Sequence, residues 1–157
     1  IETFEELDRF RKQQEVDFTE IDTERQELIT EIDYLTGLVS LYHEFEPYLE
    51  VKKQSIELKG LSKSKFDKEH EQELLNYSEY RERLENKLPK GAKPTPKAWE
   101  KKINTLQEKL NSTNPKYART VSDLAYAEVI SFNKKNYERE QANEHGNKSR
   151  RKEQEIE

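Results

Sequence analysis

The chain has 157 residues, of which 39% are charged and only 31% hydrophobic, and its formal net charge at pH 7 is −5. An average soluble domain is roughly 45–50% apolar and 25% charged, so this composition argues against a globule with a deep ligand pocket. Because cysteine is absent, disulfide frameworks, thiolate zinc sites and cysteine nucleophiles are excluded.

The first residues do not have the pattern of a signal segment. The chain opens at Ile1 rather than at methionine, from which we expect an excised domain of a larger protein. No apolar run approaches the roughly 18 residues that span a bilayer. We therefore expect a soluble, cytoplasmic protein without membrane insertion.

Residues 1–46 are predicted to form one long helix with a heptad pattern. Counted from Phe4 as position a, ten of the fourteen a and d positions up to Leu49 are apolar. A pattern sustained over six heptads indicates a helix that buries a stripe against another helix. Arg11, Gln14 and Arg25 interrupt the first half of this stripe, where they either fix the register or mark a frayed arm.

Residues 47–88 are predicted to form a kinked helix followed by a short helical pair. Pro47 removes a backbone hydrogen bond and clashes with the preceding turn, which predicts a kink or a break between Phe45 and Tyr48. Gly60 suits the left-handed position that ends a helix. We expect the two short helices over residues 64–76 and from Ser78 onwards.

Residues 89–95 are predicted to be a linker, since the stretch 89–96 contains three prolines and a glycine. Thr95–Pro96 and Asn114–Pro115 each have the pattern of an N-cap followed by a proline in the first turn. They predict a hairpin of two antiparallel helices over residues 96–140. The aperiodic and highly charged residues 141–157 are predicted to be a disordered tail.

Together these elements predict an all-α fold: an elongated helical bundle with a long, coiled-coil-like N-terminal helix and a C-terminal helical hairpin. We expect one face of the helix that begins at Pro96 to cover the second half of the long helix. That face comprises Trp99, Ile103, Leu106 and Leu110.

The first half of the long helix then has no segment left to cover it. We expect this half to project as an arm whose apolar stripe binds a partner, with a second copy of the chain as the first candidate. The predicted partner interface comprises Phe4, Leu7, Phe18, Ile21 and Leu28.

A cluster of lysines surrounds the linker and the start of the next helix, where Glu100 is the one acidic residue. Lysines at this density can follow the phosphates of a nucleic acid and release condensed counterions. A solvated surface patch is the alternative interpretation. The members of this lysine cluster are Lys87, Lys90, Lys93, Lys97, Lys101 and Lys102.

Catalytic residues do not form a recognisable pattern. The three histidines His43, His70 and His145 are too far apart in sequence for a metal-ligand motif. The chain has no glycine-rich phosphate loop, nucleophile elbow or zinc-binding helix motif. We therefore expect no catalysis, metal, cofactor or small-molecule substrate. The eight tyrosines either pack in the core or stack on the bases of a single strand beside the lysines.

Several short motifs within residues 35–137 resemble, in the same order, the helical C-terminal region of relaxases, the mobilization nucleases of conjugative elements and plasmids of Gram-positive bacteria. These motifs are Leu58-Lys59-Gly60-Leu61, Lys65-Phe66, His70-Glu71, Glu73-Leu74, Tyr77, Thr95-Pro96-Lys97-Ala98-Trp99, Ile103 and Leu106.

Relaxases nick one DNA strand with a tyrosine nucleophile and a histidine-bound metal in an N-terminal α/β domain. This chain lacks the paired histidines of that site, so the resemblance implies a non-catalytic region downstream of the nuclease. It also implies a role in relaxosome assembly, in oligomerisation, or in recruitment to the coupling protein and secretion channel.

The leading hypothesis is therefore a non-catalytic C-terminal interaction domain of a conjugative relaxase. It would support DNA mobilization by self-association, or by binding a relaxosome or coupling-protein partner, through the N-terminal helix. Two alternatives stay open: a nucleic-acid-binding helical module that uses the lysine cluster, and a structural coiled-coil scaffold.

Overall fold

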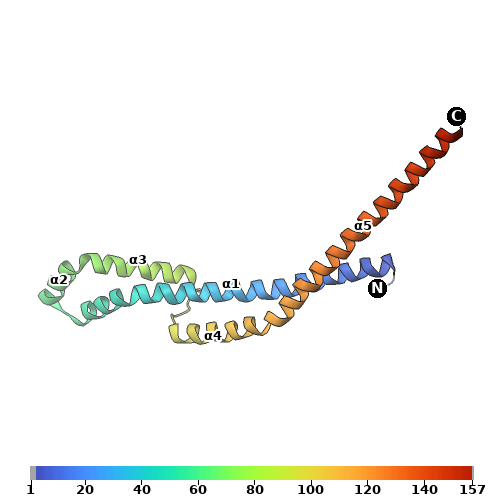
Figure 1. Ribbon diagram of the computed structural model, residues 1–157. Helices are drawn as coiled ribbons and strands as arrows, with labels where there is room; N and C mark the ends of the chain where they lie inside the picture. Colours follow the sequence, from blue (N-terminus) through green and yellow to red (C-terminus); the bar gives the residue numbers. More distant parts are fainter. Residues whose placement is uncertain (1–2, 157) are drawn as a thin grey trace. The chain divides into compact units, whose positions relative to one another are not determined.

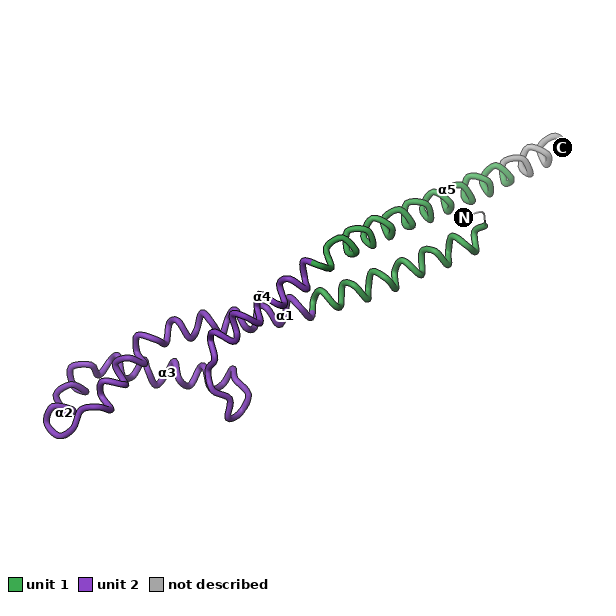
Figure 2. Tube along the Cα trace, turned by 90° about the horizontal axis from the view of Figure 1, so that it is seen from below, with its two compact units in different colours: residues 1–26, 112–157 green, residues 27–111 purple. Residues whose placement is uncertain are grey.

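The computed structural model describes the backbone of residues 3–156 and the side chains of residues 3–146. The helices are α1 (Phe4–Glu57), α2 (Gly60–Glu69), α3 (Glu71–Lys87), α4 (Pro96–Ser112) and α5 (Asn114–Ile156), as Figure 1 shows. The predicted all-α class, with a long N-terminal helix and a C-terminal pair of helices, is confirmed. The chain divides into two compact units, coloured in Figure 2: residues 1–26 with 112–157 form unit 1, and residues 27–111 form unit 2.

Unit 2 is built on the second half of α1, with α3 and α4 along two different sides of it (Figure 1). The face of α4 predicted from sequence does cover α1, since Trp99 and Leu106 are buried there and the Trp99 ring meets the Tyr42 ring edge-on at 6.4 Å. The buried cluster comprises Leu35, Leu38, Leu41, Phe45, Leu84, Trp99 and Leu106. Because α1 has two neighbours here, its buried face is wider than a single a/d seam.

The predicted kink or break at Pro47 does not end the helix, because α1 continues through this residue to Glu57. Stacked rings hold the chain to α3 on both sides of the proline. Phe45 stacks on Tyr77 at 5.3 Å, and Tyr48 stacks on Tyr80 at 5.5 Å. Pro47 itself is exposed, so water can satisfy the carbonyl group that loses its partner. The boundary expected between residues 46 and 47 therefore lies inside one helix.

A polar network around buried Ser55 closes the turn from α1 into α2. Ser55 is almost fully buried, and its hydroxyl donates a hydrogen bond to Oδ1 of Asp67 over 2.5 Å. Lys63 Nζ donates to the carbonyl oxygen and the hydroxyl of Ser55, each over 3.0 Å. Gly60, at φ +62°, supplies the left-handed turn expected of it, although it begins α2 instead of closing the preceding helix.

The short helical pair is present as α2 and α3, but its internal boundary differs from the prediction. The break falls at His70, and α3 runs without interruption through Ser78. At the position of the predicted linker, residues 88–95 join α3 to α4 without helix, and α4 begins at Pro96. Within this loop Gly91 has φ +81° and Ala92 N–H donates to the carbonyl of Pro89 over 2.9 Å.

Unit 1 is an antiparallel pair formed by the first part of α1 and by α5 (Figure 2). Leu7 and Ile21 of α1 are buried, as is Ala127 of α5. The ring of Phe18 lies 6.2 Å from that of Tyr117. The expected projecting arm is therefore wrong: α5 covers the apolar stripe of the first half of α1.

Two of the polar interruptions in the heptad set the contacts between α1 and α5. Arg25 donates hydrogen bonds to Thr113 and Asn114 over 2.6 and 2.7 Å, and its guanidinium lies 4.4 Å from the centre of the Tyr117 ring. Arg11 donates to Ser131 over 3.4 Å. These contacts agree with the interpretation that the arginines fix the register between α1 and its neighbour. They do not agree with the interpretation that the arginines mark a frayed arm.

The expected tail over residues 141–157 is helical as far as Ile156, the last residue described. Residues 141–156 are mainly glutamate, glutamine, lysine and arginine, which favour helix, and they extend a helix already nucleated by its packing.

The compact units also differ from the linear segments that were expected from the sequence. The helices expected to pair as an antiparallel hairpin over residues 96–140 belong to different units, because α4 and α5 each pack on their own stretch of α1.

A pair of leucine substitutions tests the core of unit 2. Leu38 is 1% exposed and Leu61 is 90% exposed. Leu38→Ala should lower the free energy of unfolding by about 2–5 kcal/mol, because it leaves a cavity, whereas Leu61→Ala should change it by less than about 0.5 kcal/mol. Urea titrations followed by circular dichroism measure both, and equal losses would contradict the core assigned here.

The Ser55 network predicts an altered acid titration. The hydrogen bond from Ser55, reinforced by the charge of Lys63, holds the pKa of Asp67 below its ordinary value. A depressed folded-state pKa stabilises the fold above the ordinary carboxyl pKa, and this stabilisation is lost as pH falls through the folded value. Ser55→Ala should raise the pKa of Asp67 towards its ordinary value, as carboxyl ¹³C NMR would measure. Exposed Ser62 supplies the control, since Ser62→Ala should leave the pKa of Asp67 unmoved.

Candidate binding surfaces

The lysine cluster lies on the surface of unit 2, at the end of α3, in the loop and in the first turns of α4. All six side chains are at exposed positions. Lys102 forms an ion pair with Glu31 of α1 at 2.7 Å. At Lys87 the backbone carbonyl accepts a hydrogen bond from the Tyr34 hydroxyl over 2.5 Å, which fixes the end of α3 against α1. The loop and α4 therefore present the lysines from an anchored backbone.

A groove of about 520 Å³ opens beside this cluster. Its walls combine aromatic and aliphatic side chains with the charged groups Arg81, Glu85 and Lys93. Arg81 Nε donates to Glu85 over 3.0 Å, and this carboxylate raises the pKa of the guanidinium above its ordinary value. The other lining residues are Tyr42, Phe45, Leu49, Tyr77, Leu84, Leu88, Ala92 and Pro94.

The structure covers most of the predicted partner interface with α5. Leu7 and Ile21 are buried and Phe18 is half-buried in unit 1, whereas Leu28 is half-buried against the core cluster of unit 2. Phe4 is 52% exposed, but the Lys134 ammonium lies 4.2 Å from the centre of its ring. These five residues consequently do not form the open stripe from which a partner was predicted.

Most of the large exposed apolar side chains of unit 1 lie instead on α5, on the side turned away from α1, while Phe4 and Val16 of α1 are also exposed. The large side chains on this side of α5 are 40–63% exposed. We call this surface the α5 outer face; it comprises Val121, Tyr126, Val129, Phe132 and Tyr137.

The α5 outer face has no charged member between its two ends. At 100° per residue, the five side chains fall within an arc of about 160° centred opposite α1. The residues that share this arc between Val121 and Tyr137 are Ser122, Ala125, Asn133 and Asn136. In a chain that is 39% charged, an uncharged face of this length is unusual. The pattern could have been read from sequence as a second apolar stripe on the helix.

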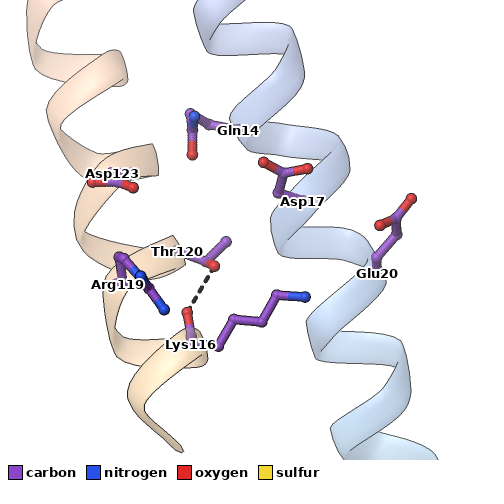
Figure 3. A pocket seen from close by; sticks show the side chains of 7 residues that line it. All are labelled: Gln14, Asp17, Glu20, Lys116, Arg119, Thr120 and Asp123. Atoms are coloured by element: carbon purple, nitrogen blue, oxygen red, sulfur yellow. Dashed lines mark hydrogen bonds between the residues drawn. The ribbon is translucent and has the colours of Figure 1, made fainter. Parts of the chain in front are cut away.

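A polar cavity of about 370 Å³ lies between α1 and α5 within unit 1 (Figure 3). Asp17 and Glu20 line it from α1, and Lys116 and Arg119 line it from α5, together with Gln14, Thr120 and Asp123. The Thr120 hydroxyl donates to the carbonyl of Lys116 over 2.7 Å. Lys116 and Arg119 of α5 thus line the same cavity as Asp17 and Glu20 of α1, where opposite charges attract, and Asp123 adds a carboxylate on the α5 side.

Metal-binding and membrane-spanning features were sought in the described part of the chain. No three His, Asp or Glu side chains there are grouped so that they could hold a metal ion. Among the same residues, no helix combines the length and apolar character needed to cross a membrane.

The chain was compared with protein-family models, with curated proteins and with solved structures, and none of the three comparisons gives a match.

Proposed function

We propose that this chain is a non-catalytic interaction domain of a conjugative relaxase, which supports DNA mobilization in the cytoplasm by binding a protein partner. The relaxase origin rests on the ordered motifs between Leu58 and Leu106. The binding role rests on one observation, which is the exposed apolar and uncharged α5 outer face.

The α5 outer face has the composition expected of the centre of a protein interface. Such centres are enriched in tyrosine and phenylalanine and depleted of charge. Tyr126, Phe132 and Tyr137 are each more than half exposed. Large apolar side chains grouped on one helix face lower the free energy of the system when a second surface excludes water from them.

A mating experiment tests this proposal in the full-length relaxase that contains the chain. Tyr126→Asp together with Phe132→Asp should lower the frequency of DNA transfer by at least about tenfold, since buried aromatic side chains dominate binding energy. Nicking at the origin of transfer should be unchanged, because these residues are placed outside the nuclease.

Lys135→Asp is the matched control, because it introduces the same carboxylate on α5 outside the outer face. Unchanged transfer in the double variant would contradict the interaction role. A gene without an upstream histidine-cluster nuclease domain would contradict the relaxase origin.

A second candidate function is the binding of single-stranded nucleic acid by unit 2. The observation that favours it is the groove with Tyr42 and Tyr77 in its walls, directly beside the exposed lysines. Proteins that bind single strands combine basic side chains for the phosphates with aromatic rings for the bases.

Fluorescence anisotropy with a labelled oligonucleotide tests this candidate. Lys97→Ala with Lys101→Ala should weaken binding and reduce the slope of log K against log salt by about 1.4, since each phosphate contact contributes roughly 0.7. Lys102 is left intact because of its ion pair with Glu31. Lys65→Ala with Lys68→Ala, exposed on α2, is the control and should bind as the unmodified chain does. Absence of binding at low salt, or equal losses in both variants, would remove this candidate.

A further inference from the structure

We propose that the partner of the α5 outer face is the same face of a second copy of this chain. The inference rests on the interaction role proposed above and names its partner. It also moves the expected self-association from the first half of α1 to α5, because α5 already covers that part of α1.

The absence of charge favours a second copy over an unrelated protein. In a two-fold interface the same surface of each subunit meets its copy, so a face charged with one sign would bring like charges together. The outer face avoids this penalty from Val121 to Tyr137, because Asp123, Glu128, Lys134 and Lys135 all fall outside its arc. A partner chosen by charge complementarity, by contrast, would need charges of the opposite sign to meet.

The size of the face also fits a dimer. Tyr126, Phe132 and Tyr137 are 57–63% exposed. With roughly 150–250 Å² for each aromatic side chain, these three present roughly 270–450 Å² of surface, and two valines add to it. A standard interface buries about 800 Å² per partner, of which roughly 450–520 Å² is apolar. The outer face alone thus supplies most of the apolar surface that a stable dimer requires.

The shape of the face allows two copies to approach closely. Ala125 and Ser122 lie between the larger side chains and leave room for a ring from the opposite helix. In the dimer, each α5 packs against α1 of its own chain on one side and against α5 of the second copy on the other. Both apolar stripes of α5 are then buried.

Sedimentation equilibrium of the 157-residue chain between about 1 and 100 µM tests the inference. The unmodified chain should sediment with twice the mass of one chain at the upper concentrations. Phe132→Asp should raise the dissociation constant more than about tenfold, because it buries an unpaired carboxylate in the interface. Ala125→Asp, at an exposed position that changes no core contact, should do the same.

Lys135→Asp is again the matched control and should remain dimeric. Circular dichroism at 222 nm verifies that each variant keeps its helix content. A monomer at 100 µM would overturn the inference, and so would a dimer that persists in both Phe132→Asp and Ala125→Asp or is lost in Lys135→Asp. A monomeric chain whose double variant still lowers DNA transfer would leave the proposed function standing with a different partner.

Discussion

The apolar stripe of α1 supplies the packing surface for α3, α4 and α5, because the chain has too few apolar residues to build a second core. In unit 2 the stripe receives Leu84 from α3 and Trp99 and Leu106 from α4. In unit 1 it receives Ala127 and the ring of Tyr117 from α5. Each shorter helix therefore needs only one apolar face, and the remaining positions can be charged. This arrangement reconciles a hydrophobic content of 31% with defined packing.

Contacts that are not purely apolar decide where along α1 each helix sits. Arg25 holds Thr113 and Asn114 at the start of α5, and Tyr34 holds the carbonyl of Lys87 at the end of α3. Ser55, Lys63 and Asp67 fix the turn into α2. Apolar stripes alone allow helices to slide by a turn, whereas directional hydrogen bonds select one register. The polar residues in the heptad thus reduce the apolar contact between helices, but they specify the register in which the helices pack.

The parts of the fold that follow from local chemistry could be predicted from sequence. The heptad of α1, the loop before Pro96 and the covering of α1 by Trp99 all depend on spacing and on proline geometry. Two features could not be predicted from sequence, because they depend on contacts between residues that are distant in sequence. Continuity through Pro47 relies on stacking of Phe45 and Tyr48 on α3. The cover over the first half of α1 relies on α5, whose apolar residues occupy two faces, so its pattern does not reveal which face turns inward. The lysine cluster could be predicted because charged residues are evident in the sequence. The groove beside it could not, because it forms only where α1, α3 and the loop before α4 meet.

The sequence separation of the contacts has a consequence for the order of folding. In unit 2, Ser55 meets Asp67 across 12 residues and Tyr34 meets Lys87 across 53, whereas in unit 1 Arg25 meets Thr113 across 88 and Arg11 meets Ser131 across 120. Longer loops are entropically harder to close, and a chain emerging from the ribosome folds from its N-terminus. Unit 2 can therefore assemble while the first turns of α1 wait for α5 to be synthesised.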